Sequence, residues 1–503
     1  MNGYAEKFGS KAVVRSEIVI IGAGFSGLGM AIKLKESGID DFVVLEKGVG
    51  VGGVWLHNTY PGCRAHLAAA LYSFSFAPKR DWAAMYASQE DLQQYAHELV
   101  DRYSLSEHLH FDAEVTSMAF DEATNEWQIL TRGGTRYKAH LVFAGFGPWH
   151  EPNTPEIPGI EEFTGTQIHS SDWSADFDPR GKRIAVVGSG ASAVQIVPEL
   201  AEQADQIHVV QRSAPYILPR FEWRYGRMYK AALRGLPGLQ RAFRATWAIS
   251  NEGLYRAQYS RLFRRLYGAF ASVYRWQLLK DPDLRRVMTP EYEFGCKSPT
   301  VTSTYYPALN RSNVEVIDSG VGRITDNSVV SAKGESREVD AIVWATGFTC
   351  HGTILSLPIV GSNGALLSEV WESNPSRGME SYNGTAIAGF PNLFLIIGPN
   401  GGMVHTSAFM TIEFQTEYLM EIVKLVRTRC LDRIEVKADA QQEFVSRAHR
   451  VTAQGVWSLG GCSNDFVDDR GINRAVWPGS ALSMWWHTRR VVQSDYLLTP
   501  RNS

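Results

Sequence analysis

The sequence is poor in cysteine and has no excess of either charge. Its 503 residues include five cysteines, none in a CxxC pair: Cys63, Cys296, Cys350, Cys430 and Cys462. Because structural zinc sites and redox-active disulfides usually need cysteines close together, we expect free thiols and a cytoplasmic location. Lysine and arginine total 50 against 53 aspartate and glutamate residues, which gives a net charge of −3. Without a basic field, nucleic acid is not expected as a partner.

Long apolar stretches and metal-binding motifs are also missing. No run approaches the roughly 20 apolar residues that span a bilayer, and the first 15 residues are mostly polar. We therefore expect no stable membrane insertion and no export signal. There is no HExxH motif, and the one HxH, at His108 and His110, has no cysteine nearby. No metal is expected, and the two histidines are interpreted as solvated residues on one strand face.

A glycine-rich turn near the N-terminus organises the chain. The apolar run 18–21 predicts a buried parallel strand, which leads into Gly22, Gly24 and Gly27 and then into an amphipathic helix. These glycines permit a tight turn, the approach of a pyrophosphate and close helix packing. A second strand ends at Glu46, 19 residues after Gly27, where a carboxylate would meet a ribose hydroxyl. The segment predicts a dinucleotide site.

The chain is too long for one ordinary core, so two or three domains are expected. Residues 48–76 are rich in glycine and aromatic residues and follow no clean period. Such a segment suits packing across a flat ligand, with an ordinary buried loop as the alternative. Residues 88–103 have a helical period, with Ser88 as the N-cap.

Further strands and a linker follow this helix. The alternating stretches 113–120 and 127–131 predict antiparallel strands of a small accessory sheet. Residues 140–147 predict another buried strand that ends in glycine. Four prolines between residues 148 and 158 then indicate a linker and a domain boundary.

A second glycine turn repeats the first pattern beyond the linker. Its strand leads into small residues, namely Gly188, Gly190, Ser192 and Ala193. The following strand ends at Arg212, 19 residues after Ala193, where the first motif has Glu46. An acid there would repel a 2′-phosphate, whereas an arginine can bind one, so this site is expected to prefer NADPH. The alternative is a solvated arginine at a strand end.

The remaining segments suggest an insert and a return to the first domain. Residues 221–279 are mostly helical and interleave aromatics with arginines in their second half. Two interpretations stay open: aromatics that face a core, or a lid or lipid-facing entrance for an apolar substrate. Strands at 338–348 and 391–402 follow, the second opening into a helix from about residue 406. Because a late strand must join a sheet, the C-terminal part is expected to rejoin the first domain.

The expected fold class is α/β, with two Rossmann-like dinucleotide-binding domains, the second inserted into the first. Residues 1–147 and 385–503 are assigned to a discontinuous FAD-binding domain. Residues 148–384 are assigned to an NADPH-binding domain, which includes the helical insert at about 221–290.

The segment between the two nucleotide motifs resembles a known family. Phe163, Gly165, His169 and Trp173 stand at the spacing FxGxxxHxxxW. This resembles the fingerprint of the Baeyer–Villiger monooxygenases, the class B flavoprotein monooxygenases. The family motif ends in Pro or Asp, whereas Ser174 follows here.

Other motifs extend the resemblance over nearly the whole chain. Residues 52–62 are similar to the family's flavin-facing GGxWxxNxYPG loop, with matches at Gly52, Gly53, Trp55, Asn58, Tyr60, Pro61 and Gly62. Further similar motifs contribute the cofactor-binding candidates Thr346, Gly347, Asn400 and Met403. The Gln211-Arg212 pair, Gly461-Cys462 and residues 477–479 also look familial.

The resemblance implies FAD and NADPH as cofactors, with O2 and a small apolar organic substrate as partners. In this family NADPH reduces FAD, O2 adds to form a C4a-peroxyflavin, and the deprotonated peroxide converts a ketone to an ester or lactone. The protein then has to bind the cofactors, exclude water and stabilise an anion. His169 is implied to tie linker motion to NADPH binding, with a purely structural histidine as the alternative.

The family's acid–arginine pair at the reaction centre is absent. His66 stands where the family has the acid, and Ser298 stands where it has the arginine. Lys297, just before Ser298, is interpreted as a second ligand of the 2′-phosphate. Joint loss avoids an unpaired buried acid. It also removes an oxyanion stabiliser, which typically costs about 10²–10³ in rate.

Three explanations stay open. His66 or Lys297 replaces the arginine, and Baeyer–Villiger oxygenation persists. Alternatively, the flavin hydroperoxide stays protonated and oxygenates nitrogen or sulfur. In the third, oxygen is not inserted, and the protein is an NADPH oxidase, a flavin reductase or a degenerate binding protein. Substrate identity and oligomeric state do not follow from the sequence.

Overall fold

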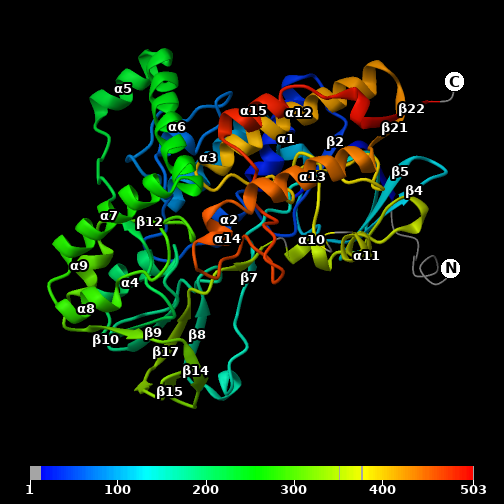
Figure 1. The fold of residues 1–503 in the computed structure, drawn as a ribbon. Coiled ribbons are helices and arrows are strands. Elements are labelled where there is room, and N and C mark those ends of the chain that lie inside the picture. The colour runs from blue at the N-terminus through cyan, green and yellow to red at the C-terminus, as the bar shows by residue number, and fades with distance from the viewer. Residues whose placement is uncertain (1–12, 351, 375, 377, 502–503) are drawn as a thin grey trace.

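The computed structural model describes residues 13–350, 352–374, 376 and 378–501. The polar opening segment considered above lies mostly outside this part, since residues 1–12 are not described. Two β-sheets form separate lobes, with the second sheet below the first in Figure 1. Within the described residues, no helix combines the length and apolarity needed to cross a bilayer.

The first sheet is built on the N-terminal glycine motif. Its strands run in the order β19-β4-β5-β6-β1-β2-β3, and β20 pairs with β6. The bounds are β1 Val13–Ile21, β2 Phe42–Leu45, β3 Leu109–His110, β4 Val115–Asp121, β5 Glu126–Thr131, β6 Arg136–Ala144, β19 Ile359–Val360 and β20 Leu393–Leu395. Strand β1 lies between β2 and β6, parallel to both, and Ile18, Val19 and Ile20 are fully buried. This is the environment that the apolar run predicts.

Two sequence expectations near this sheet need correction. Strands β4 and β5 are antiparallel as expected, but they belong to the main sheet, because β5 also pairs with β6. His108 and His110 are not solvated neighbours on one strand face. His108 is buried and stacks on Phe42 at 4.0 Å, whereas His110 is partly buried and bonds the Tyr137 hydroxyl.

Helices pack on both faces of the first sheet. The bounds are α1 Phe25–Glu36, α2 Val54–His57, α3 Gln89–Arg102, α10 Gly352–Ser356, α11 Leu367–Ser373, α12 Ala408–Thr428, α13 Ala438–Thr452, α14 Val456–Leu459 and α15 Ala481–Thr488. The expected N-cap is confirmed, since the Ser88 hydroxyl accepts the Asp91 N–H and Asp91 completes a capping box. A short antiparallel pair, β21 Leu431–Val436 and β22 Tyr496–Pro500, closes the C-terminus.

The second sheet contains the second glycine motif. Its strands are all parallel, in the order β13-β10-β9-β17-β8. The bounds are β8 Thr166–His169, β9 Arg183–Val187, β10 Gln206–Gln211, β13 Val314–Asp318 and β17 Ala341–Trp344, with helices α4 Ala193–Ala201 and α9 Tyr305–Leu309. A small antiparallel sheet of β14 Val321–Ile324, β15 Ser328–Ser331 and β16 Ser336–Glu338 lies beyond them. The structure thus contains two Rossmann-type domains, the second inserted into the first.

The chain passes between the domains along two adjacent segments. Outgoing β7, Glu151–Pro152, pairs antiparallel with returning β18, Phe348–Thr349. The chain rejoins the first sheet at β19, which pairs with β4, and Ile354 and Ile359 are buried in its core. The expected return at residue 385 is therefore too late. The short strand β19 carries little periodic signal, which explains the error.

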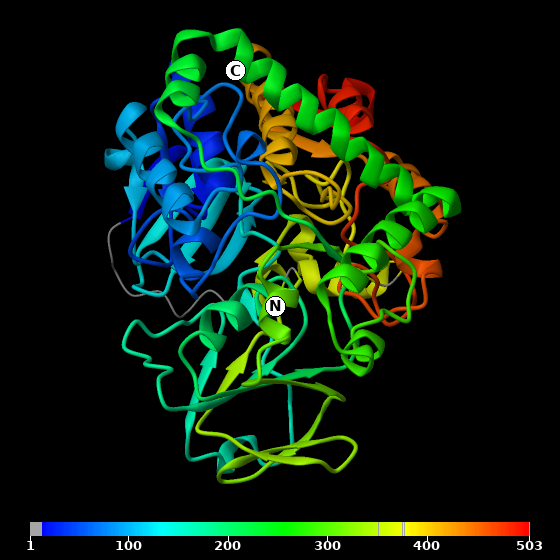
Figure 2. The ribbon, with the colours of Figure 1, turned by 90° about the vertical axis from the view of Figure 1, so that its left-hand side faces the viewer.

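The helical insert contacts both domains. Its helices are α5 Arg227–Gly235, α6 Pro237–Tyr259, α7 Arg261–Leu278 and α8 Pro282–Val287, and the flanking strands β11 Ile217–Leu218 and β12 Thr300–Val301 pair with each other. Helix α6 is anchored to the first domain by an Arg244–Glu413 ion pair at 3.0 Å. On α7, the Tyr274 hydroxyl donates to the Thr302 carbonyl. The insert therefore does not belong to the second domain alone, and Figure 2 shows its helices along one side of the molecule.

Candidate functional site

The first glycine turn is closed by steric constraints. Gly22 has φ +92°, and a Cβ there would lie 2.6 Å from the Gly145 carbonyl oxygen. At Gly27 a Cβ would lie 1.9 Å from the Gly22 carbonyl oxygen. Gly24 is the N-cap of α1 and has no side chain to cover the free N–H groups. These glycines bring the helix N-terminus against the end of β1, which favours a phosphate there.

A cavity of about 560 Å³ opens from this turn. Its lining includes Gly22, Gly24, Glu46, Gly53 and Trp55. The buried Glu46 carboxylate accepts hydrogen bonds from the Ala23 and Gly48 N–H groups, at 2.7 and 2.8 Å. Each carboxylate oxygen keeps a further lone pair for a ribose hydroxyl. The glycine turn, which has no side chains to block a phosphate, and the positioned Glu46 carboxylate fit FAD.

The flavin-facing loop packs closely on this turn. Gly53 has φ +58°, and a Cβ there would lie 3.0 Å from the Gly24 Cα. Trp55 meets Tyr72 edge-on at 5.9 Å, and both rings line the cavity. Asn58 instead donates to the Val54 carbonyl at 2.8 Å. Its role in the described structure is to shape the loop.

Two other residues predicted near FAD lie outside the cavity. Buried Asn400 donates from its amide to the Asn473 carbonyl at 2.9 Å, which ties its loop to the C-terminal segment. Met403 is buried in the core of the first domain. Neither residue lines the cavity.

The end of the same loop enters the second domain. Tyr60 and Cys63 are buried in the core around α4. A Cβ at Gly62 would lie 2.8 Å from the Gln195 carbonyl oxygen, and the Arg64 N–H donates to the Gln195 side chain at 2.8 Å. Burial raises the pKa of Tyr60 well above its usual value, while its hydroxyl bonds Ser192. The loop therefore joins the two nucleotide-binding turns.

The second turn is more open than the first. Gly188 has φ +129°, and a Cβ there would lie 2.2 Å from the Ala345 carbonyl oxygen. At Gly190 a Cβ would meet nothing within 4 Å. The open position leaves room for a pyrophosphate between the strand and α4.

Cations gather at the end of β10. The Lys297 ammonium donates to the Ser213 hydroxyl at 2.8 Å, and Arg212 precedes Ser213. Burial and then the nearby Arg212 lower the pKa of Lys297, while Asp465 partly opposes this. Two cations and a hydroxyl next to a dinucleotide turn fit the 2′-phosphate of NADPH. The structure thus brings together Arg212 and Lys297 from separate parts of the sequence.

The fingerprint residues lie where the domains connect. The His169 Nε2 donates to the Gly347 carbonyl at 3.1 Å, and its Nδ1 accepts from the Ser171 hydroxyl at 2.7 Å. Burial lowers the pKa of His169, which favours the neutral ring with this proton assignment. The Thr346 hydroxyl donates to the Asn153 carbonyl at 2.6 Å. His169 and Thr346 therefore hold the two connecting segments together.

The other three fingerprint residues pack within the second domain. Phe163 is buried in the core beneath the sheet. Gly165 cannot carry a side chain, because a Cβ there would lie 2.5 Å from the Asp340 carbonyl oxygen. Trp173 meets Phe177 edge-on at 5.7 Å and packs on the core around α4.

His66 and Ser298 are in different surroundings. The His66 ring bonds the Gln195 side-chain amide, and burial followed by nearby Arg220 lowers the pKa of His66 to about 4. Ser298 is exposed, and among the described residues its hydroxyl has no hydrogen-bond partner. The structure shows no contact between these two side chains within its described part. Arg220 has a side chain only 8% exposed and pairs with Glu222 at 2.5 Å. No motif surrounds Arg220 in the sequence, because it follows an ordinary short strand, β11.

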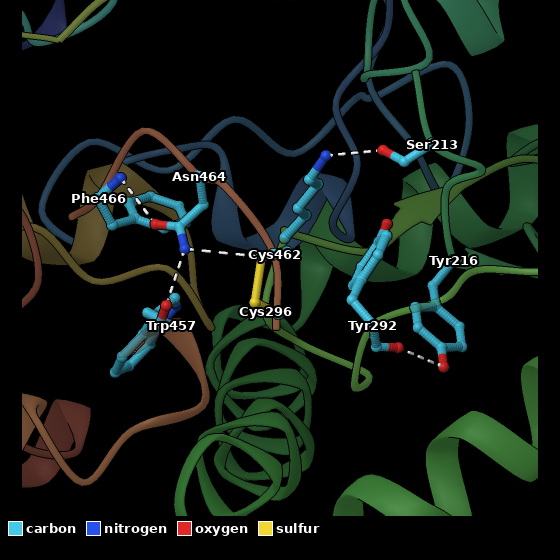
Figure 3. Close-up of a disulfide and its surroundings, with 9 residues drawn as sticks. Ser213, Tyr216, Tyr292, Cys296, Trp457, Cys462, Asn464 and Phe466 are labelled. Carbon is cyan, nitrogen blue, oxygen red and sulfur yellow. Dashed lines mark hydrogen bonds between the residues drawn. A yellow bond between two sulfur atoms is a disulfide. The ribbon is translucent and has the colours of Figure 1, made fainter. Parts of the chain in front are cut away.

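The expectation of free thiols is wrong for two cysteines. Cys296 and Cys462, which are 166 residues apart, form a disulfide (Figure 3). A hydrogen bond from the Glu293 N–H to the Gly460 carbonyl brings their loops together. Cys63, Cys350 and Cys430 are free. Sequence spacing could not show a pair formed between distant segments, and cysteine usage no longer supports a reducing compartment.

Comparison with known proteins agrees with this arrangement. A family model described as "Pyridine nucleotide-disulphide oxidoreductase" matches residues 19–217. A Baeyer–Villiger monooxygenase of Pseudomonas aeruginosa is 38% identical over 489 residues, which are 96% of this chain and 91% of that protein. A Baeyer–Villiger monooxygenase of Streptomyces coelicolor is 36% identical, over 95% of this chain and 92% of that protein.

Solved structures show the same fold. An oxidized steroid monooxygenase bound to NADP superimposes with a TM-score of 0.86 at 26% identity, covering 97% of this chain and 100% of that one. A cyclohexanone monooxygenase from Rhodococcus sp. Phi1 bound to NADP+ gives 0.86 at 25% identity, with the same coverage.

The fold, the two nucleotide sites and these relatives define an FAD- and NADPH-dependent monooxygenase, which uses O2 and an organic substrate. More specifically, the chain belongs to the Baeyer–Villiger monooxygenase family.

Proposed function

We propose that this protein inserts one oxygen atom of O2 into an apolar ketone to form an ester or lactone. The observation that carries the proposal is the loop from Gly53 to Arg64. It lines the cavity at the first nucleotide turn and is buried against α4 of the second domain. One rigid segment therefore supports both nucleotide sites, as electron transfer between two bound cofactors requires.

Some residues bind the cofactors, and others shield the flavin from water. When bound, NADPH supplies the hydride and FAD supplies the activated oxygen. Glu46 holds the ribose of FAD, and Arg212 and Lys297 hold the 2′-phosphate of NADPH. Trp55 and Tyr72 cover the flavin cavity with aromatic surface, which excludes water from it.

We assign the role of the missing family arginine to Arg220. Its side chain is nearly enclosed, and its charge acts on His66, which occupies the position of the family's acid. The low pKa of His66 keeps that ring neutral near pH 7, so His66 itself supplies no cation. Exposed Ser298 cannot supply one. We therefore propose Arg220, whose guanidinium also pairs with Glu222, as the cation that stabilises negative charge developing on the reacting oxygen.

The primary test measures where the oxygen goes. Purified FAD-loaded protein is supplied with NADPH and O2 and, separately, with apolar ketones, sulfides and amines. The expected result is ketone oxygenation with one oxygen atom added per NADPH. Sulfide or amine products without ketone products would favour the N- or S-oxygenase alternative. Stoichiometric H2O2 with every substrate would favour the oxidase.

An arginine variant tests the proposed cation. Arg220→Gln is expected to lower the rate of ketone oxygenation by about 10²–10³, as for other lost oxyanion stabilisers. Arg220→Lys is expected to restore part of the rate. Exposed Arg227 at the start of α5 provides the control, and Arg227→Gln is expected to leave the rate unchanged. Equal rates in Arg220→Gln and Arg227→Gln would refute the role of Arg220.

A further inference from the structure

Helix α7 presents an apolar face that nothing in the described structure covers. Five large side chains on it are each between 51% and 64% exposed: Leu262, Leu266, Phe270, Val273 and Trp276. Their spacing of three or four residues puts them on one face of the helix. Figure 1 shows α7 on the left-hand side of the molecule, near β12 and α9.

The opposite face fixes the helix firmly to the protein. Ala271 is buried, Tyr267 stacks on Phe294 with ring centroids 5.4 Å apart, and Tyr274 bonds the Thr302 carbonyl. Because these contacts set the rotation of α7, its apolar face cannot turn inward. The core interpretation of the aromatics therefore accounts for the inner face only.

Cations outnumber acids around the exposed face. Arg261 and Arg265 are exposed on α7, and exposed Lys280 and Asp281 follow its end. The helix from residue 261 to 278 contains no aspartate or glutamate. Arg264, which does not share this exposed face, is neutralised by Glu293 at 2.5 Å. The exposed face thus combines apolar side chains with an excess of cations.

The apolar side chains and the cations together favour one of two possible partners for this face: a second copy of the protein or a lipid surface. A second copy packed symmetrically on the same face would bring arginines against arginines, which is unfavourable. An anionic lipid surface accepts both features, because the apolar side chains enter the acyl boundary and the cations meet the headgroups.

We propose that the exposed face of α7 docks the protein on membranes that contain anionic lipids, without spanning them. Docking would place the enzyme where apolar molecules accumulate. This surface role goes beyond the proposed oxygenation and does not depend on it, because lipid binding is measured without substrate.

The test is flotation of the full-length, FAD-loaded protein with vesicles. One set contains phosphatidylcholine alone, and the other contains phosphatidylcholine with phosphatidylglycerol. We expect the protein to float with the anionic vesicles and to be released as salt is raised, since the cations contribute. Phe270→Glu is expected to lower the bound fraction at least about tenfold, because a charge at this position opposes burial in lipid.

Exposed Met228 on α5 provides a matched control, since it is 88% exposed and lies outside the proposed face. Met228→Glu is expected to bind anionic vesicles like the wild type. Flavin content and NADPH oxidation report folding of both variants. Failure of the wild type to bind either vesicle, or equal binding of Phe270→Glu and Met228→Glu, would overturn the proposal. So would a dimer in light scattering that Phe270→Glu dissociates.

Discussion

The two nucleotide turns have the same strand–turn–helix plan but differ in tightness and in charge. In the first turn, α1 begins at Phe25, three residues after Gly22, and Gly27 touches the strand. In the second, α4 begins at Ala193, five residues after Gly188, and the third small position carries a methyl group. The first strand pair ends at an acid and the second at a cation. Backbone contacts thus shape each turn, whereas we propose that the charged residue at the end of the second strand selects the nucleotide.

The largest expected difference lies at the glycines. Gly27→Ala would place a methyl group 1.9 Å from the Gly22 carbonyl oxygen, so the turn must deform. We expect loss of bound flavin, measured by visible absorbance, and a lower melting temperature, measured by calorimetry. Gly190→Ala meets no protein atom within 4 Å. It is expected to keep flavin and stability but to raise the KM for NADPH. If both variants lost flavin equally, the contrast in tightness would be wrong.

The second prediction concerns the cations of the second site. A charge-assisted hydrogen bond contributes about 1.5–3 kcal/mol, so Arg212→Ala should raise the KM for NADPH by about 10- to 100-fold. The KM for NADH should change little, since NADH has no 2′-phosphate. Steady-state kinetics with both nucleotides provides the measurement. Lys297→Ala is expected to act in the same direction. Equal effects on both nucleotides would remove these residues from the 2′-phosphate site.

The third prediction concerns the acid of the first site. Glu46→Gln keeps the size of the side chain but removes the charge and one acceptor for the Ala23 and Gly48 N–H groups. We expect FAD to bind about tenfold more weakly, which corresponds to about 1.4 kcal/mol, by titration of the apoprotein. The KM ratio for NADPH and NADH should stay unchanged. A shift in that ratio would contradict the separation of the two sites.

The last expected effect is a pH dependence of stability. The pKa of His66 is about 4 in the folded protein, against 6.5 for an ordinary histidine. The unfolded chain therefore binds a proton that the folded protein does not, and stability falls as pH drops from about 6.5 towards 4. His66→Gln should make this fall shallower in denaturant titrations between pH 7 and 4. An unchanged slope would show that His66 is protonated normally in the folded protein.

The sequence predicted the parts of this structure that local patterns determine. Both glycine turns, the parallel strands around Ile18–Ile21 and the Ser88 N-cap follow from spacing and from local hydrogen bonding. The approach of Arg212 and Lys297 was also expected, since the resemblance placed both near one phosphate. Their joint position beside Ser213 is now seen.

Contacts between distant segments were harder to predict. Arg220 became visible only when the fold placed it near His66, because no motif surrounds it in the sequence. Ser298 was assigned to the reaction centre by its place next to Lys297, yet its side chain is exposed. The return of the chain to the first sheet was also missed, because β19 has only two residues, Ile359 and Val360. In each case a tertiary contact, which leaves no local pattern, decided the outcome.

The disulfide between Cys296 and Cys462 changes the mechanical connectivity of the molecule. The two chain crossings at β7 and β18 lie side by side, and, apart from the disulfide, the other links described between the domains are non-covalent. The bridge adds a third tether, from the segment that carries Lys297 to a C-terminal loop that carries Asp465. The bridge thus covalently limits how far the segment that carries Lys297 can separate from this C-terminal loop.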